Sequence, residues 1–173
     1  MKIGIYSLLV LSFFCSKFSF ASDTFSTIKC GSEISKKLIG RHVKNEKVVD
    51  IEARHKSIDL KNLGMDDISE GLIAGYWMIC GNKFILLEDK KLLMIRDVIQ
   101  VPDDPTRLVE FTGQCTVHDK EKSELIFAIL NKEDGVATLS AHSAWIIDEK
   151  KKAFKKTSTD GMRCENFTSA PPP

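Results

Sequence analysis

The sequence lacks the short motifs that mark common catalytic and metal sites. It contains no G-x-S-x-G nucleophile elbow, no H-E-x-x-H zinc motif and no glycine-rich phosphate loop. Its cysteines form no C-x-x-C pair, so neither a thioredoxin-like redox site nor a zinc knuckle is indicated. The motifs therefore predict no cofactor, no metal ion and no catalytic activity.

An excess of one charge is also missing. The chain has 25 lysines and arginines and 24 aspartates and glutamates. The first 21 residues carry Lys2 and Lys17 and no acid, so the rest of the chain has a net charge of about −1. Proteins that bind nucleic acids generally need a strong basic excess. We therefore expect no nucleic-acid partner and no general attraction to anionic lipid.

A long apolar run occurs once, at the start of the chain. Lys2 precedes the run Ile3–Phe14, and Ser19 and Ala21 place small residues where a signal peptidase reads them. The run is too short for a permanent membrane span, and no later run reaches the roughly 18 apolar residues that a span needs. We therefore expect residues 1–21 to be a cleaved signal peptide, with an uncleaved anchor as the alternative. The predicted mature protein is periplasmic or secreted and has no transmembrane segment.

The remaining 152 residues suit one globular domain. Hydrophobic residues make up 43% of the chain and charged residues 28%, which is ordinary for a folded protein. The sequence shows no internal repeat and no flexible linker, so we expect a single domain over residues 22–168. Residues 169–173 end in three prolines and are predicted to be a disordered tail.

The predicted mature chain has four cysteines: Cys30, Cys80, Cys115 and Cys164. An even number of cysteines in an exported protein indicates two disulfides. Four cysteines allow three pairings, and the sequence does not decide among them. Cys30 and Cys80 are nearly as far apart in the sequence as Cys115 and Cys164. This spacing favours two sequential bridges, each closing a loop of roughly 50 residues.

Alternating apolar and polar residues dominate the chain after Gly75. In the segment 109–118, for example, Val109, Cys115 and Val117 share the parity that faces a core. A hairpin is expected across Glu88–Lys91, and Asp134-Gly135 is expected to form another turn. The predicted strands are 84–87, 92–95, 109–118, 125–130, 136–147 and 153–157.

The N-terminal part of the predicted domain is expected to contain short helices. Ser32 is positioned to cap a helix that ends at Gly40, and a second helix is predicted over 66–74. Residues 47–53 and 57–60 are expected to form short strands. The predicted fold class is mainly β: a single antiparallel β-sandwich or partly closed β-barrel, with one or two short N-terminal helices and two disulfides.

Ser140 and His142 are the strongest candidates for catalysis. They lie two residues apart on one face of a predicted strand, as a nucleophile and its base would. A flat strand, however, does not expose a serine as a nucleophile elbow does. The pairs Asp66-Asp67 and Asp103-Asp104 have simpler explanations as a helix start and a turn. A small secreted hydrolase is therefore an alternative hypothesis only.

Two features could form a binding surface. The first is a basic hairpin made of Lys150, Lys151, Lys152, Lys155 and Lys156, which could contact an acidic protein or an anionic envelope surface. Lysines at strand edges also keep proteins soluble, and this is the simpler explanation.

The second feature is the aromatic pair Tyr76 and Trp77. Adjacent strand residues face opposite sides, so one of the two could be exposed as an interface anchor. Core packing is the favoured interpretation for Trp77.

The predicted function is that of an exported non-catalytic binding protein with a protein partner. An inhibitor or immunity protein that neutralises an extracytoplasmic enzyme, such as a cell-wall-directed one, fits this description. An envelope-associated structural protein is a further alternative, in which the basic hairpin rests on an anionic surface.

Overall fold

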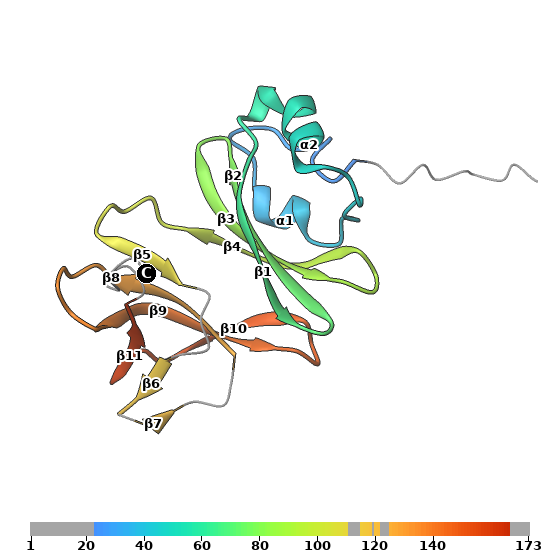
Figure 1. Cartoon of the computed structure of the whole chain (residues 1–173). Helices are drawn as coiled ribbons and strands as arrows, with labels where there is room; N and C mark the ends of the chain where they lie inside the picture. Colours follow the sequence, from blue (N-terminus) through green and yellow to red (C-terminus); the bar gives the residue numbers. More distant parts are fainter. Residues whose placement is uncertain (1–22, 111–114, 119, 122–124, 167–173) are drawn as a thin grey trace, which may run out of the picture.

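The computed structural model describes residues 23–110, 115–118, 120–121 and 125–166, in which short helical segments are followed by strands (Figure 1). The helical segments are α1 (Ile34–Leu38), α2 (Val48–Arg54) and the 3-10 turn η1 (Lys56–Ile58). The strands are β1 (Lys61–Ser69), β2 (Leu72–Ile79), β3 (Asn82–Asp89), β4 (Met94–Val101), β5 (Arg107–Glu110), β6 (Cys115–Val117), β7 (Lys120–Glu121), β8 (Ile126–Asn131), β9 (Thr138–Asp148), β10 (Ala153–Thr157) and β11 (Met162–Glu165). No helix in these ranges combines the length and apolar composition that crossing a membrane requires.

The first sheet is an antiparallel meander in the order β1-β2-β3-β4. Its two faces contribute to different apolar clusters. Trp77 and Ile79 pack with the N-terminal helical segment, whereas Ala74 and Tyr76 on the other face pack with the second sheet. Because both faces are covered, the central strand β3 is buried from Phe84 to Asp89.

The second sheet has seven strands and is organised around β9. One edge of β9 pairs with β8, and the other edge pairs with β11 near its start and with β10 near its end. β5 extends the sheet beyond β8, and β6 and β7 extend it beyond β11. Residues 126–130 of β8 are all buried, which explains their uninterrupted apolar sequence.

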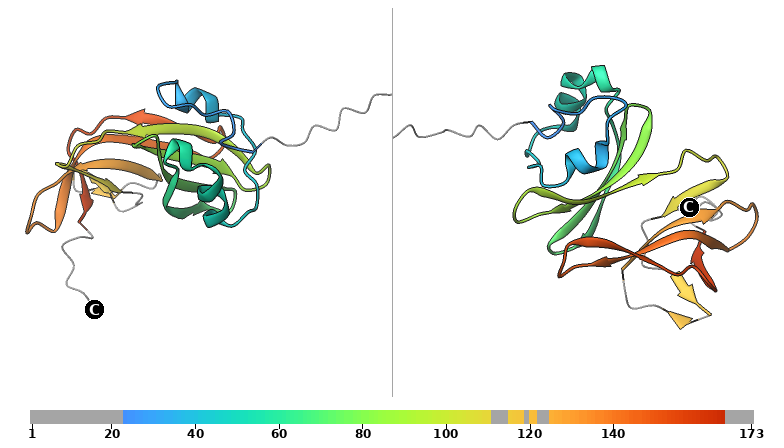
Figure 2. Two further views of the ribbon diagram at one scale, coloured as in Figure 1. Left: turned by 90° about the horizontal axis from the view of Figure 1, so that it is seen from above. Right: turned by 180° about the vertical axis from the view of Figure 1, so that it is seen from behind.

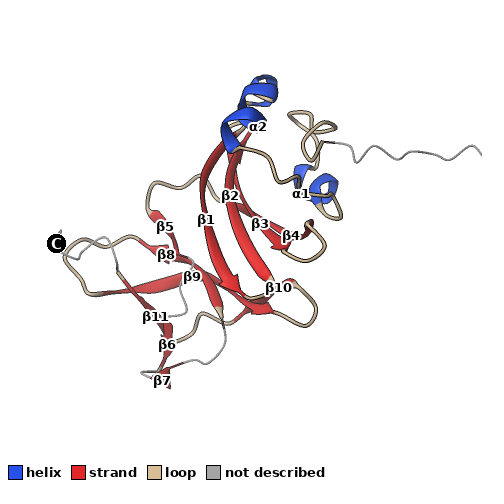
Figure 3. Cartoon of the chain, turned by 45° about the vertical axis from the view of Figure 1, so that its right-hand side comes forward, coloured by secondary structure: helices blue, strands red, loops and turns tan. Residues whose placement is uncertain are grey.

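The two sheets pack against each other through side chains from both. Phe127 and Ile129 of β8 share an apolar cluster with Ile85 of β3 and Ile99 of β4. The helices lie beside β1–β4 and away from β5–β11 (Figure 3). The arrangement is therefore a sandwich-like pair of open sheets with a helical layer on the outer face of the first sheet.

The β9–β10 hairpin of the second sheet lies beside the first sheet, next to β4 (Figure 2). Polar contacts join the two. The backbone N–H of Phe154 donates to Asp97 Oδ2 on β4 at 2.8 Å. Lys152, in the turn of the hairpin, donates to the buried carboxylate of Asp89 at the end of β3. These contacts fix the hairpin against the end of the first sheet.

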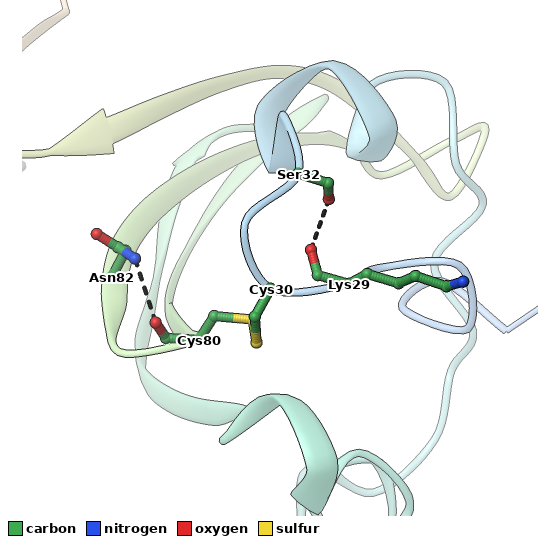
Figure 4. Close-up of a disulfide and its surroundings, with 5 residues drawn as sticks. All are labelled: Lys29, Cys30, Ser32, Cys80 and Asn82. Carbon is green, nitrogen blue, oxygen red and sulfur yellow. Dashed lines mark hydrogen bonds between the residues drawn. A yellow bond between two sulfur atoms is a disulfide. The ribbon is translucent and has the colours of Figure 1, made fainter.

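Two disulfides are present, with the pairing that the spacing favours. Cys30–Cys80 connects the segment before α1 to the turn between β2 and β3, and Cys80 is flanked there by Asn82, whose amide donates to the Cys80 carbonyl at 3.2 Å (Figure 4). Cys115 and Cys164 lie directly opposite each other on β6 and β11, with their Cα atoms 4.0 Å apart. The first bridge therefore links the N-terminal helical segment to the first sheet, and the second bridge lies within the second sheet.

The fold class is confirmed as mainly antiparallel β with short N-terminal helices and two disulfides. The sandwich-like alternative is the one observed, because neither described sheet closes on itself. The predicted signal peptide (1–21), the predicted tail (169–173) and residues 111–114 of one predicted strand lie outside the described residues. The helix expected after Ser32 is present as α1, which buries Ile34 and Leu38 one turn apart. The predicted cap is wrong, because Glu33 is the N-cap residue and the Ser32 hydroxyl donates to the Lys29 carbonyl instead.

Three local predictions in the N-terminal part are wrong. Residues 47–53 lie largely in α2 rather than in a strand, because Val48 and Ile51 pack on the N-terminal cluster from one face of a helix. Residues 57–60 contain the end of η1 instead of a strand. The helix expected over 66–74 is a hairpin of β1 and β2, because pairing of β2 with β3 along its whole length overrides local helix preference.

Candidate functional site

A cleft of about 450 Å³ opens between the helical layer and the first sheet. Residues of α2 and of the preceding loop line it on one side, and residues of β1, β2 and β3 line it on the other. Its apolar lining includes Val43, Val48, Ile51, Ile73, Trp77 and Leu93. Concave, mainly apolar sites with a few polar groups are the usual form of ligand-binding pockets.

Three residues of β2 and β3 meet on the sheet face below this cleft. Gly75 has no side chain, and the edge of the Trp77 indole occupies the space above it. A Cβ atom on Gly75 would lie 2.8 Å from Trp77 Nε1 and 3.2 Å from Glu88 Oε1. The glycine therefore allows an indole N–H and a carboxyl oxygen to approach the same small region.

Trp77 is buried and closely packed in this position. Its ring is 5% exposed and packs against Phe25, with 5.2 Å between ring centroids. The Nε1 atom is buried and has no hydrogen-bond acceptor among the described residues. Buried indole N–H groups normally have an acceptor, so this unpaired donor requires an explanation.

Glu88 is the second polar group in this region. Its side chain is 9% exposed on β3, and burial raises the pKa of its carboxyl from the ordinary 4.5 to about 7. Lys90 also lines the cleft, but its ammonium contacts Asp67 at 2.6 Å and the Ser69 carbonyl at 2.9 Å. Within the described ranges, Glu88 has neither a hydrogen bond nor a salt bridge.

The rim of the cleft carries exposed apolar side chains. Met65 on β1 is 57% exposed, and Leu93, in the turn before β4, is 49% exposed. Both residues line the cleft, and Met65 lies opposite Gly75 in the register of β1 and β2. Exposed apolar groups that border a concave site indicate a surface for binding.

The buried carboxyl of Glu88 predicts that the protein loses stability as the pH rises from about 4.5 to 7. The folded state keeps the proton over this range and the unfolded chain releases it, so deprotonation favours unfolding. The shift corresponds to a loss of roughly 3 kcal/mol in the free energy of unfolding above pH 7. Glu88→Gln has no proton to lose, so in urea unfolding it should be more stable than wild type by about this amount at pH 8. At pH 4 the two proteins should differ little. The exposed Glu133→Gln should follow wild type at both values.

The aromatic candidates from the sequence face opposite sides of β2, as expected. Trp77 lies in the core, which confirms the favoured interpretation, and its Nε1 and Cδ1 atoms lie beside Gly75. Tyr76 is half-buried against the second sheet, where burial and the charge of Asp103 raise the pKa of its phenol. Neither ring is an exposed anchor, because both faces of the first sheet are covered.

The lysines of the basic hairpin do not form one uniform patch. Lys150 and Lys151 are exposed in the turn, and Lys155 is exposed on β10. Lys152 points inward instead, because it pairs with the buried carboxylate of Asp89. Lys152 therefore has a structural role, unlike the exposed lysines of the hairpin. Binding by the exposed lysines remains a prediction.

The catalytic candidates are not assembled into a site. The Ser140 hydroxyl accepts a hydrogen bond from Asn131 Nδ2 at 2.8 Å, and His142 is exposed. No hydrogen bond joins Ser140 to His142 in the part of the chain that is described. Nor does that part contain a group of three or more potential metal ligands.

The sequence-based prediction missed Met65 and Leu93 at the rim of this site, and it also missed Glu88. Glu88 was assigned to a turn across Glu88–Lys91, whereas β3 continues through Asp89. The signal that could have revealed it is parity, because Phe84, Leu86 and Glu88 lie on one face of the strand. A charged residue at the third apolar position of such a series is a candidate buried carboxyl.

Comparison with known proteins finds no family model, no curated protein and no solved structure that matches this chain.

Proposed function

We propose that this protein is an exported binding protein that engages a protein partner through the cleft between the helical layer and the first sheet. An inhibitor of an extracytoplasmic enzyme is the kind of protein that fits. The two disulfides and the export-type leader support action in an oxidising compartment.

One observation carries the proposal. Glu88 and the indole N–H of Trp77 lie together at an apolar cleft without a partner among the described residues. Leaving buried polar groups unpaired destabilises a fold unless the groups serve another purpose. A bound partner that supplies a hydrogen-bond donor would account for Glu88, which lines the cleft. The exposed Met65 and Leu93 at the rim would contribute apolar contact area.

The proposal is tested by site-specific crosslinking in the native cell. A photo-crosslinking amino acid replaces Met65 in one variant, the exposed Glu133 in a second and the exposed Lys155 in a third. We expect a discrete crosslinked protein from position 65 and none from position 133. A crosslink from position 155 in place of position 65 would contradict the cleft and favour the basic hairpin.

The affinity of the identified partner then locates the contact. Met65→Glu should weaken binding about tenfold or more, because it places a charge at the apolar rim. Val49→Glu is the matched control. Val49 on α2 is also an exposed apolar residue, at 65% exposed, but it does not line the cleft. Equal affinities for the two variants would rule out the cleft as the binding site.

A further inference from the structure

Glu88 is the polar group through which the cleft can contact a ligand. Its side chain is 9% exposed and lines the cleft. Among the described residues, the side-chain polar atoms that are fully enclosed without a hydrogen bond are Asn62 Nδ2, Trp77 Nε1 and Arg107 Nε. The carboxyl oxygens of Glu88 are not enclosed in this way, and neither has a hydrogen bond within the described ranges. An ionised carboxylate can only accept, so both oxygens are available to a donor in the cleft.

The charges around the cleft favour a positively charged donor. Every other carboxylate of the described lining already has a cation: Asp67 contacts Lys90, Asp89 contacts Lys152, and Glu46 contacts both Lys44 and Arg54. The two lysines that line the cleft are among these partners. Glu88 is therefore the carboxylate of the described lining that lacks a counter-charge. A cationic donor beside it would gain charge-assisted hydrogen bonds in an apolar setting.

A guanidinium group suits this position better than an ammonium group. Its planar fork donates to both oxygens of one carboxylate at once, whereas an ammonium group acts as a point charge. It is also more weakly hydrated, so moving it from water into an apolar cleft costs less free energy. The aliphatic stem of an arginine side chain can pack along apolar surface, and the cleft offers this surface in Val43, Ile51 and Ile73.

We propose that the cleft receives an arginine side chain of the partner protein. The guanidinium group donates to the Glu88 carboxylate, and the arginine stem lies against the apolar walls. The partner's surface around this arginine contacts the rim at Met65 and Leu93. Arginine is among the residues that most often dominate the binding energy of protein interfaces. This inference rests on the proposed function and names the chemical group by which the cleft would recognise its partner.

The test is a titration of the ¹³C,¹⁵N-labelled protein with N-acetyl-arginine methylamide and N-acetyl-citrulline methylamide. Citrulline has nearly the shape of arginine but carries no charge. Burial raises the pKa of Glu88 to about 7, so the titration is carried out at about pH 8, where the carboxyl is ionised. The readout is the side-chain carboxyl carbon resonance of Glu88, which is assigned by its absence in Glu88→Gln. We expect the arginine probe to shift this resonance to saturation, and the citrulline probe to bind at least about tenfold more weakly.

A third probe, N-acetyl-lysine methylamide, distinguishes the guanidinium group from positive charge alone. It should bind more weakly than the arginine probe, because its ammonium group lacks the planar fork and is more costly to dehydrate. A lysine probe that binds as tightly as the arginine probe would overturn the assignment to arginine.

Variants connect the effect to its residues, with the backbone amide resonances of Met65 and Leu93 as the readout. Glu88→Gln should reduce the affinity for the arginine probe at least about tenfold, and Glu133→Gln should leave it unchanged. Equal binding of the arginine and citrulline probes would overturn the inference. So would a Glu88 resonance that no probe moves. If either result accompanies a crosslink from position 65, the recognition chemistry is wrong while the proposed function stands.

Discussion

Removing the disulfide Cys30–Cys80 is expected to lower the free energy of unfolding by about 2–4 kcal/mol, and removing Cys115–Cys164 should have a similar effect. The two bridges close loops of nearly equal length, with sequence separations of 50 and 49 residues. The chain-entropy contribution of a disulfide depends on this length, so the double alanine variants should lose comparable stability. Urea unfolding of the two variants and the wild type measures both losses.

The consequences for local structure should differ between the bridges. Cys30–Cys80 anchors the segment that carries Phe25, which packs on Trp77. Its removal should increase hydrogen exchange in the helical layer and shift the Trp77 indole resonance, whereas removal of the other bridge should leave both unchanged. A free thiol in the oxidised mature protein would contradict the two-bridge structure. So would wild-type stability in both double variants.

Strand periodicity explains why the second half of the fold could be predicted. β8 is an uninterrupted apolar run, and β9 and β10 follow turns that contain glycine or charged residues. The helical layer was harder to predict, because Val48 and Ile51 also suit a strand and become helical only through their contact with the core. The hairpin of β1 and β2 likewise depends on pairing with β3.

The candidate site depends even more on contacts between distant residues. Trp77 and Glu88 lie on neighbouring strands, and the cleft beside them exists only because α2 and the preceding loop cover part of the sheet. The spacing of residues along the sequence does not indicate that α2 and this loop pack over the sheet. The sequence also groups Lys152 with its lysine neighbours, although its partner Asp89 lies 63 residues away. Patterns along the chain therefore indicate strands well and nonlocal polar pairs poorly.

The ion pair between Lys152 and Asp89 leads to the second large effect. We expect Lys152→Met to lower the free energy of unfolding by about 3–5 kcal/mol, because it leaves a fully buried carboxylate without its cation. The neighbouring Lys151 is exposed, and Lys151→Met should change stability by less than about 0.5 kcal/mol. Urea unfolding at neutral pH compares the two methionine variants directly.

A double variant separates loss of charge pairing from loss of packing. Asp89 Oδ1 also accepts hydrogen bonds from the backbone N–H groups of Lys91 and Leu92, at 3.0 and 3.1 Å. Asp89→Asn can keep this acceptor and removes the charge, so Lys152→Met/Asp89→Asn should recover much of the stability that Lys152→Met loses. If the double variant is less stable than Lys152→Met, packing of the lysine stem accounts for the loss instead.

The pH dependence provides an independent measure of the same contact. The hydrogen bond from Lys152, followed by those from Leu92 and Lys91, holds the pKa of the Asp89 carboxyl below its ordinary value. The folded state therefore binds this proton less readily than the unfolded chain does. The resulting stabilisation is present above the ordinary pKa and disappears as the pH falls through the lowered one. Wild type should thus lose its advantage over Lys152→Met as the pH falls below about 4, and an advantage that is independent of pH would exclude the ion pair as its source.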